Sequence, residues 1–116
     1  MPTLVARRAQ RLVEEALADT PIVVIQGARQ VGKSTLAQQL LVSGDRYVTL
    51  DDPTERAAAI ADPTSYVEQA PNGCLAIDEA QRVPELVLAL KASVDRDRRP
   101  GRFLLTGSAN LLRIST

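Results

Sequence analysis

The sequence predicts an α/β fold, in which helices on both faces cover a mainly parallel sheet of about four strands. Two observations indicate this class. Short runs rich in Val, Ile and Leu alternate along the chain with longer segments of helical periodicity. In addition, the 116 residues are 45% hydrophobic, which is enough material for the core of one small domain. We therefore treat residues 1–116 as a single domain.

The first half of the chain opens with an amphipathic helix over residues 3–18. Its apolar residues at helical spacing are Leu4, Val5, Leu12, Val13, Ala16 and Leu17. The apolar run 22–26 (IVVIQ) predicts a buried strand. A glycine-containing loop and a helix over residues 33–42 follow, and then a second strand over residues 46–50 (RYVTL).

Two Asp-Pro pairs mark the starts of the next two helices, at about 53–61 and 63–70. An aspartate at the N-cap accepts hydrogen bonds from free backbone N–H groups, and proline is favoured in the first turn. Asp52 has Glu55 three residues later, which is the spacing of a capping box.

The second half of the chain predicts two further strands. The third is CLAI, residues 74–77, and it ends before Asp78 and Glu79. Pro84 begins a helix over PELVLALKASVD, and RFLL, residues 102–105, is the fourth strand. Cys74 is then a buried strand residue rather than a reactive thiol.

Composition excludes several classes of function. The formal net charge is zero, which argues against bulk electrostatic binding to nucleic acid or to an anionic membrane. The chain has no histidine, which excludes zinc sites of the usual kind and histidine acid–base chemistry. Its apolar runs are too short to span a bilayer, and residues 1–10 lack the apolar segment of a signal peptide. A cytoplasmic location without membrane contact is therefore expected.

The stretch GARQVGKST fits the pattern G-x-x-x-x-G-K-[ST] and lies between a predicted strand and a predicted helix. Glycines allow backbone N–H groups to approach phosphates, and the helix N-terminus adds partial positive charge. Lys33 would reach the β- and γ-phosphates, and the Ser34 hydroxyl would coordinate Mg²⁺. The alternative is a glycine-rich turn without a ligand. The predicted nucleotide-binding residues are Gly27, Ala28, Arg29, Gln30, Val31, Gly32, Lys33, Ser34 and Thr35.

An acidic pair, Asp78 and Glu79, follows the third apolar run. In phosphoryl-transfer sites a strand-end aspartate holds Mg²⁺, usually through water, which predicts Asp78 and Ser34 as the metal ligands. Glu79 would polarise the attacking water as a general base, so Glu79 and Lys33 are the candidate catalytic residues. Taken alone, the pair is equally compatible with an acidic turn after a strand.

Polar residues also follow the fourth strand, in the segment TGSAN. Ligands of open parallel sheets bind at the carboxyl ends of the strands. A side chain of this segment, Thr106, Ser108 or Asn110, would therefore orient water or sense the γ-phosphate, and we include Ser108 and Asn110 among the nucleotide-binding residues. The alternative is ordinary turn chemistry around Gly107.

Four segments, GARQVGKSTLA, YVTLDDP, LAIDEAQRVPEL and FLLTGSANLL, resemble in this order the bacterial and archaeal AAA-like P-loop ATPases that usually carry a C-terminal domain of unknown function. The resemblance implies a three-layer P-loop NTPase fold. It makes residues 27–35 the Walker A loop, Asp78 and Glu79 the Walker B pair, and residues 106–110 the sensor. It further implies that the Walker B strand lies beside the Walker A strand, and that the strand over residues 46–50 lies at the sheet edge.

Members of that family are several times longer than this chain. We therefore expect a match to the N-terminal ATPase core alone, without a fifth core strand, a helical lid or the C-terminal domain. Such ATPases typically draw an arginine from a neighbouring subunit, which is compatible with a homo-oligomer. Within the chain, Arg82 and Arg113 are the candidate arginines.

Three hypotheses on function follow. The leading one is an ATPase that binds ATP with Mg²⁺ and hydrolyses it. The second is a non-catalytic nucleotide-binding or interaction module that lacks the lid and the arginine. The third is a small-molecule kinase, in which Glu79 would be dispensable. A guanine-specific site is disfavoured, since neither Lys33 nor Lys91 belongs to an N-K-x-D motif.

Overall fold

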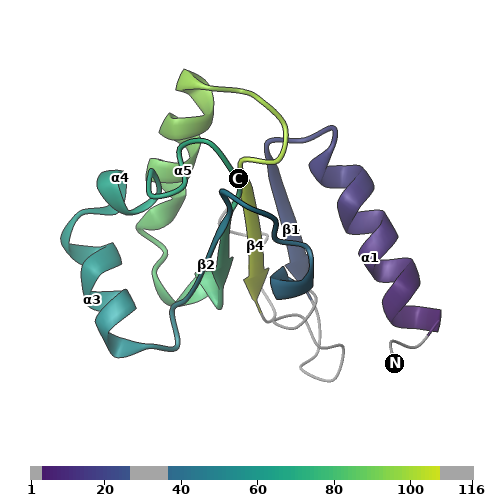
Figure 1. Cartoon of the computed structure of the whole chain (residues 1–116). Coiled ribbons are helices and arrows are strands. Elements are labelled where there is room, and N and C mark those ends of the chain that lie inside the picture. The colour runs from purple at the N-terminus through teal and green to yellow at the C-terminus, as the bar shows by residue number, and fades with distance from the viewer. Residues whose placement is uncertain (1–3, 27–36, 108–116) are drawn as a thin grey trace.

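The computed structural model describes residues 4–26 and 37–107. At its centre is a 4-stranded, all-parallel sheet with the order β1-β4-β3-β2. Helices flank both faces of this sheet (Figure 1), so the predicted α/β class with three layers is confirmed. The strands are β1 (Ile22–Gln26), β2 (Arg46–Thr49), β3 (Leu75–Asp78) and β4 (Phe103–Gly107). The helices are α1 (Leu4–Leu17), α3 (Pro53–Ala61), α4 (Pro63–Tyr66) and α5 (Leu86–Arg96).

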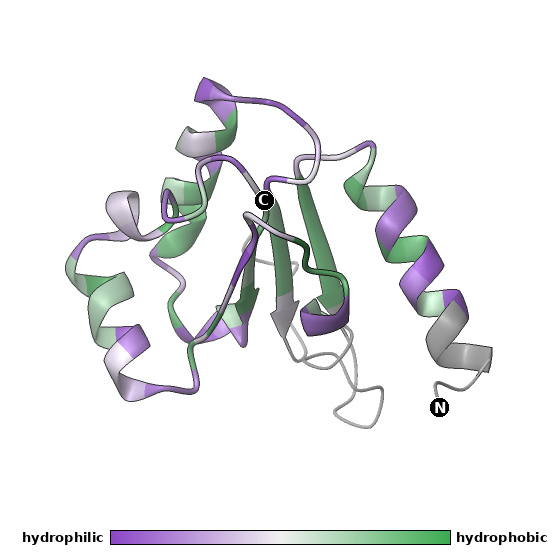
Figure 2. Ribbon diagram, in the orientation of Figure 1, coloured by the Kyte–Doolittle hydropathy of each residue, from purple (hydrophilic) through white to green (hydrophobic). Residues whose placement is uncertain are grey.

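Successive strand residues face opposite sides of the sheet, so an apolar cluster forms on each face. These two clusters hold the helical layers to the sheet. One cluster, on the α1 side, contains Val23, Ala76 and Leu104 and packs against α1 through residues such as Val13 and Leu17. The larger cluster, on the other side, joins the sheet to α3, α4 and α5. Its strand residues are Val48, Leu75, Ile77, Phe103 and Leu105. β1 and most of β4 accordingly lie among the hydrophobic parts of the ribbon, whereas the edge strand β2 is more hydrophilic (Figure 2).

The strand order corrects one expectation. β3, which ends in Asp78, does not lie beside β1, because β4 pairs with both strands and separates them. The run IVVIQ is as apolar as a central strand, although among the described strands β1 is at an edge. Its apolar side chains are covered by α1 and by both clusters, so composition does not reveal its position. β2 lies at the opposite edge, as expected.

The Asp-Pro pairs begin helices as predicted. Asp52 Oδ1 accepts a hydrogen bond from the Thr54 backbone N–H at 2.9 Å, and Asp62 Oδ1 accepts one from Ser65 N–H at 3.1 Å. The capping box is not formed: the Asp52 backbone N–H donates to the Thr49 carbonyl at 3.3 Å, and Glu55 Oε1 accepts from the Tyr66 hydroxyl at 2.7 Å. Helix α4 is also shorter than predicted and ends at Tyr66.

Other boundaries differ by a few residues. The helix predicted from Pro84 begins at Leu86, and the helix predicted over 33–42 lies partly outside the described residues, with residues 37–39 helical. Leu12, which the periodicity predicts on the apolar face of α1, is 60% exposed. Cys74 is buried as predicted, directly before β3, and burial, with the nearby charge of Asp45, raises the pKa of its thiol to about 11.

A buried arginine closes the amino end of the sheet. Arg102, which precedes β4 and is 4% exposed, donates to the carbonyls of Ser93 and Asp97 at the C-terminus of α5, both at 2.9 Å. It also donates to the Ser93 hydroxyl, which in turn donates to Glu68 Oε2 at 2.6 Å. The guanidinium charge is favourable here, because helix C-termini carry partial negative charge. The network ties α5 to the sheet.

Glu68 makes the stability of this network depend on pH. The Ser93 hydrogen bond lowers the pKa of Glu68 from 4.5, against an opposing effect of burial, and Arg96 and Arg102 lower it further. A depressed folded-state pKa stabilises the fold above the unfolded value, and this contribution is lost as the pH falls through the folded value. We expect Glu68→Gln to lose less stability than the original chain on acidification below pH 4.5.

The measurement is the free energy of unfolding by urea across the acid range. Asp62 and Asp97 also have lowered pKa values, from hydrogen bonds to Ser65 and Arg99, and they contribute equally in both proteins. If the free energy of unfolding of the two proteins fell equally as the pH was lowered, Glu68 would not be the group that makes the network depend on pH.

Candidate functional site

The strands bring several predicted site residues to one end of the sheet, the end at which the strands terminate. β1 ends at Gln26, directly before Gly27, and Gln26 pairs with Gly107 at the end of β4. Ile77 pairs with Leu105, which sets Asp78 beside Thr106. All four strands are parallel, so their carboxyl ends lie together at this end of the sheet, which we call the carboxyl end. The predicted residues 27–35, Ser108 and Asn110 lie outside the described residues.

Asp78 is the best-defined of the predicted site residues. It is the last residue of β3 and is only 5% exposed. Its Oδ2 accepts a hydrogen bond from the Tyr47 hydroxyl at 2.9 Å, and its Oδ1 accepts one from the buried Thr106 hydroxyl. Two hydroxyl donors suit an ionised carboxylate, which accepts and does not donate. A strand-end carboxylate held in this way is of the kind that contacts a cation through water in phosphoryl-transfer sites.

Glu79 has an unusual backbone conformation. Its φ is 56° and its ψ is 46°, in the left-handed region that non-glycine residues avoid. This conformation turns the chain sharply from β3 into the short 3₁₀ helix Ala80–Arg82. The half-buried Glu79 side chain accepts a hydrogen bond from Gln81 Nε2 at 2.6 Å. Adjacent acidic residues are thus held differently: Asp78 by neighbouring strands, Glu79 by the turn that follows.

The turn after β2 is tied to the same end of the sheet by arginines. Arg82 forms an ion pair with Asp51, with 2.7 Å between Nε and Oδ1. Arg56 donates to the carbonyls of Leu50 and Asp51 at 2.8 and 3.0 Å. Asp52 caps α3, as predicted, and Arg82, one of the candidate arginines, is engaged by Asp51 in this structure.

Sequence reasoning missed Tyr47 and Gln81, which donate hydrogen bonds to Asp78 and Glu79 respectively. A signal for Tyr47 exists in the alternation of its strand. In RYVT, the residues Tyr47 and Thr49 share a face, and the register sets this face beside that of Ala76 and Asp78. The strand pairing was needed to use this signal. The αL turn that brings Gln81 to Glu79 has no marker in the sequence, since glycine does not occupy it.

The parallel sheet, the helical layers on both faces and the acidic residues at the strand ends together define an α/β module with a candidate site at the carboxyl ends of its strands. The sequence matches the AAA domain family over residues 19–116, and the chain belongs to that family. Two uncharacterized proteins, from Mycobacterium bovis and Mycobacterium tuberculosis, are each 37% identical to it over 108 residues. This alignment covers 92% of this chain, which itself spans only 24% of the length of these curated relatives. No solved structure matches the sequence.

Two further properties concern the described part of the chain. Within residues 4–26 and 37–107, none of the helices combines the length and the apolar character that a membrane span requires. The same residues contain no group of three or more acidic or cysteine side chains arranged to hold a metal.

The left-handed conformation of Glu79 leads to a prediction about stability. Glu79→Ala and Glu79→Gly both remove the carboxylate and its hydrogen bond to Gln81. Only alanine retains a Cβ, which costs about 1–2 kcal/mol in a left-handed conformation. We expect the glycine variant to be more stable than the alanine variant by about 1 kcal/mol, as measured by urea unfolding. An alanine variant at least as stable as the glycine variant would contradict the observed φ.

Proposed function

We propose that the chain binds ATP together with Mg²⁺ and hydrolyses it. The observation that carries the proposal is the position of Asp78. This buried, hydrogen-bonded carboxylate lies at the carboxyl end of the sheet, where β1 also ends. β1 continues directly into GARQVGKST, the sequence of a phosphate-binding loop. Membership of the AAA domain family supports nucleotide binding at this end.

The phosphate-binding part of the proposal rests on residues 27–35. The backbone N–H groups from Gly27 to Thr35 would surround the phosphates, and Lys33 would neutralise the β- and γ-phosphates. Ser34 and, through water, Asp78 would hold Mg²⁺, which neutralises charge on the phosphates when it is bound. Asp78 fits this task because its orientation is already fixed by Tyr47 and Thr106.

Glu79 is the proposed general base. Asp78 is buried and engaged with hydroxyl donors, whereas Glu79 is half-buried and held by one described hydrogen bond, from Gln81. Release from Gln81 would allow Glu79 to accept a hydrogen bond from the attacking water and polarise it. In the sequence, Ser108 and Asn110 come shortly after β4, whose last residue pairs with the last residue of β1, and this supports their proposed role at the γ-phosphate.

The same observations leave a role for a neighbouring subunit. In phosphoryl transfer an arginine commonly stabilises charge on the γ-phosphate. Arg82, the arginine closest in sequence to Asp78 and Glu79, is paired with Asp51. We therefore propose that a second copy of the chain, in a homo-oligomer, supplies the arginine. Without it, the chain would bind ATP and not hydrolyse it, which is the second candidate function, a non-catalytic nucleotide-binding module.

Glu79→Gln tests the proposed hydrolysis. Glutamine keeps the size and most of the polarity of the side chain but cannot accept a proton. We expect Mg²⁺-dependent ATP binding to be retained and ATP turnover to fall by about 100-fold or more. Binding is measured by calorimetric titration and turnover by release of inorganic phosphate. Turnover equal to that of the original chain would contradict the role of Glu79 and favour transfer to an acceptor other than water.

The two lysines of the chain provide the control. Lys33→Ala removes the proposed phosphate contact and should abolish both binding and turnover. Lys91→Ala makes the same change on the exposed side of α5 and should alter neither. Equal behaviour of the two lysine variants would count against residues 27–35 as the phosphate site.

A further inference from the structure

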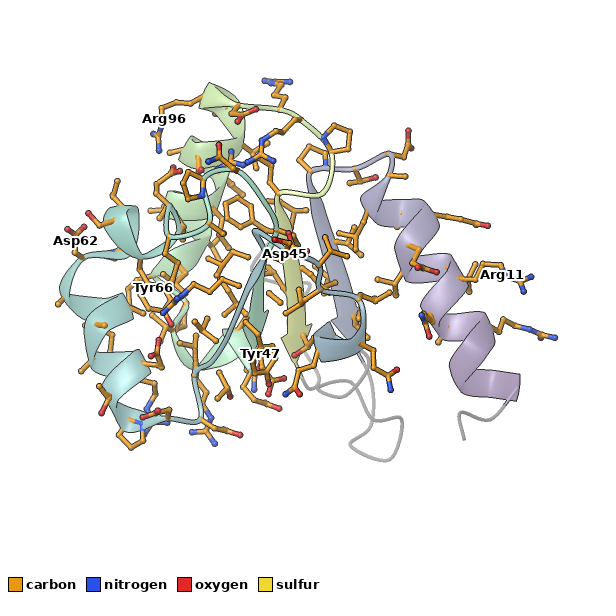
Figure 3. The ribbon with its side chains drawn as sticks, in the orientation of Figure 1. Arg11, Asp45, Tyr47, Asp62, Tyr66 and Arg96 are labelled. Carbon is orange, nitrogen blue, oxygen red and sulfur yellow. The ribbon has the colours of Figure 1, made fainter. Side chains whose placement is uncertain are left out.

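Tyr47 of β2 contacts Asp78 at the end of the neighbouring strand β3. It lies in β2 opposite Ala76 of β3, so Asp78 is its diagonal neighbour on the same face of the sheet. Diagonal neighbours on adjacent strands are within reach of an aromatic side chain. The Tyr47 hydroxyl donates to Asp78 Oδ2 at 2.9 Å, and Figure 3 shows Tyr47 toward the end of the sheet to which the strands point.

Asp78 is thereby held from both sides. Thr106 of β4 donates to Oδ1, and Tyr47 of β2 donates to Oδ2. The carboxylate cannot rotate about its Cβ–Cγ bond without breaking at least one of these hydrogen bonds. Its orientation is thus set by the two strands that flank β3, and not by the loop that follows it.

Packing alone does not require the Tyr47 hydroxyl. Tyr47 is partly buried and packs against the apolar cluster on the α1 side of the sheet, where a phenylalanine ring would pack equally well. A buried hydroxyl is unfavourable unless it is hydrogen-bonded, so its presence needs a reason beyond packing. The structure provides that reason in the bond to Asp78.

We propose that Tyr47 is a positioning residue for the magnesium site, acting through Asp78. Its hydroxyl fixes the orientation in which the carboxylate would meet the water shell of Mg²⁺ bound with the nucleotide. Hydrogen-bond donors behind a metal-binding carboxylate commonly change metal affinity by about 10–100-fold. This inference rests on the proposed function, because it concerns the same site.

Tyr47→Phe removes the hydroxyl and keeps the ring. We expect the Mg²⁺ concentration at which ATP binding is half-maximal to rise by about tenfold. The affinity for ATP in EDTA, without Mg²⁺, should not change, because the proposed role concerns the cation alone. Both quantities are obtained by titrating ATP into the chain at a series of Mg²⁺ concentrations.

Tyr66→Phe is the matched control, since the chain has only 2 tyrosines. The Tyr66 hydroxyl also donates to a carboxylate, that of Glu55 at 2.7 Å, but it lies among the helices on the other side of the sheet (Figure 3). A general loss of stability would affect both variants, whereas the proposed role shifts the Mg²⁺ dependence of Tyr47→Phe alone. An equal shift in the two variants would overturn the proposal.

The remaining outcomes are distinct. If the original chain binds Mg-ATP and Tyr47→Phe shows the same Mg²⁺ dependence, the role of Tyr47 is wrong and the proposed function stands. If the folded original chain binds no ATP at any Mg²⁺ concentration, the proposed function fails, and the role of Tyr47 fails with it. A selective rise in the Mg²⁺ requirement of Tyr47→Phe supports both.

Fluorescence gives a readout that does not depend on turnover. The chain has no tryptophan and 2 tyrosines, so in Tyr66→Phe the tyrosine emission comes from Tyr47 alone. Addition of Mg²⁺ in the presence of ATP should change this emission, since the acceptor of the Tyr47 hydrogen bond then contacts the hydrated cation. Emission that does not respond while Mg-ATP binds would contradict the proposal.

Discussion

The parallel register of β3 with its two neighbours is the constraint on which the candidate site depends. Thr49 pairs with Asp78 on one side, and Ile77 pairs with Leu105 on the other. This register sets Thr106 directly beside Asp78 and puts Tyr47 on the same face. A slip of β4 by one residue would turn Thr106 toward the opposite helical layer and leave Asp78 without that donor. The apolar clusters on the two faces oppose such a slip, because every strand residue would change sides.

The buried polar side chains of the described residues fall into two groups at opposite ends of the sheet. Ser93 and Arg102 lie at the amino end, where their hydrogen bonds join α5 to β4. Asp78 and Thr106 lie at the carboxyl end, beside Glu79 with its left-handed backbone. Backbone strain of this kind persists where the surrounding structure enforces it and is concentrated at functional sites. One end of the sheet therefore stabilises the fold, and the other is the end at which we propose the nucleotide site.

Much of this could be predicted from local sequence, because the determining interactions are local. Asp52 and Asp62 begin helices through hydrogen bonds to residues two and three positions away, and Asp78 ends a short apolar run. Strand order could not be predicted in the same way, since β1 is as apolar in sequence as a central strand, although of its residues 22–25 only Val23 is buried. The contacts of Tyr47 and Thr106 with Asp78 span 31 and 28 residues, so they exist only once the sheet has formed.

The central claim is that ATP and its cation lie at the carboxyl ends of the strands, next to Asp78. The most direct test is amide NMR of the chain with a non-hydrolysable ATP analogue and Mn²⁺ in place of Mg²⁺. Broadening by the paramagnetic ion falls steeply with distance, and each strand is long enough to separate its two ends. We predict that amides of Asp78 and Gly107 broaden first, whereas those of Cys74 and Arg102 remain sharp. Broadening that begins at the amino ends, or that is uniform along the strands, would contradict this account.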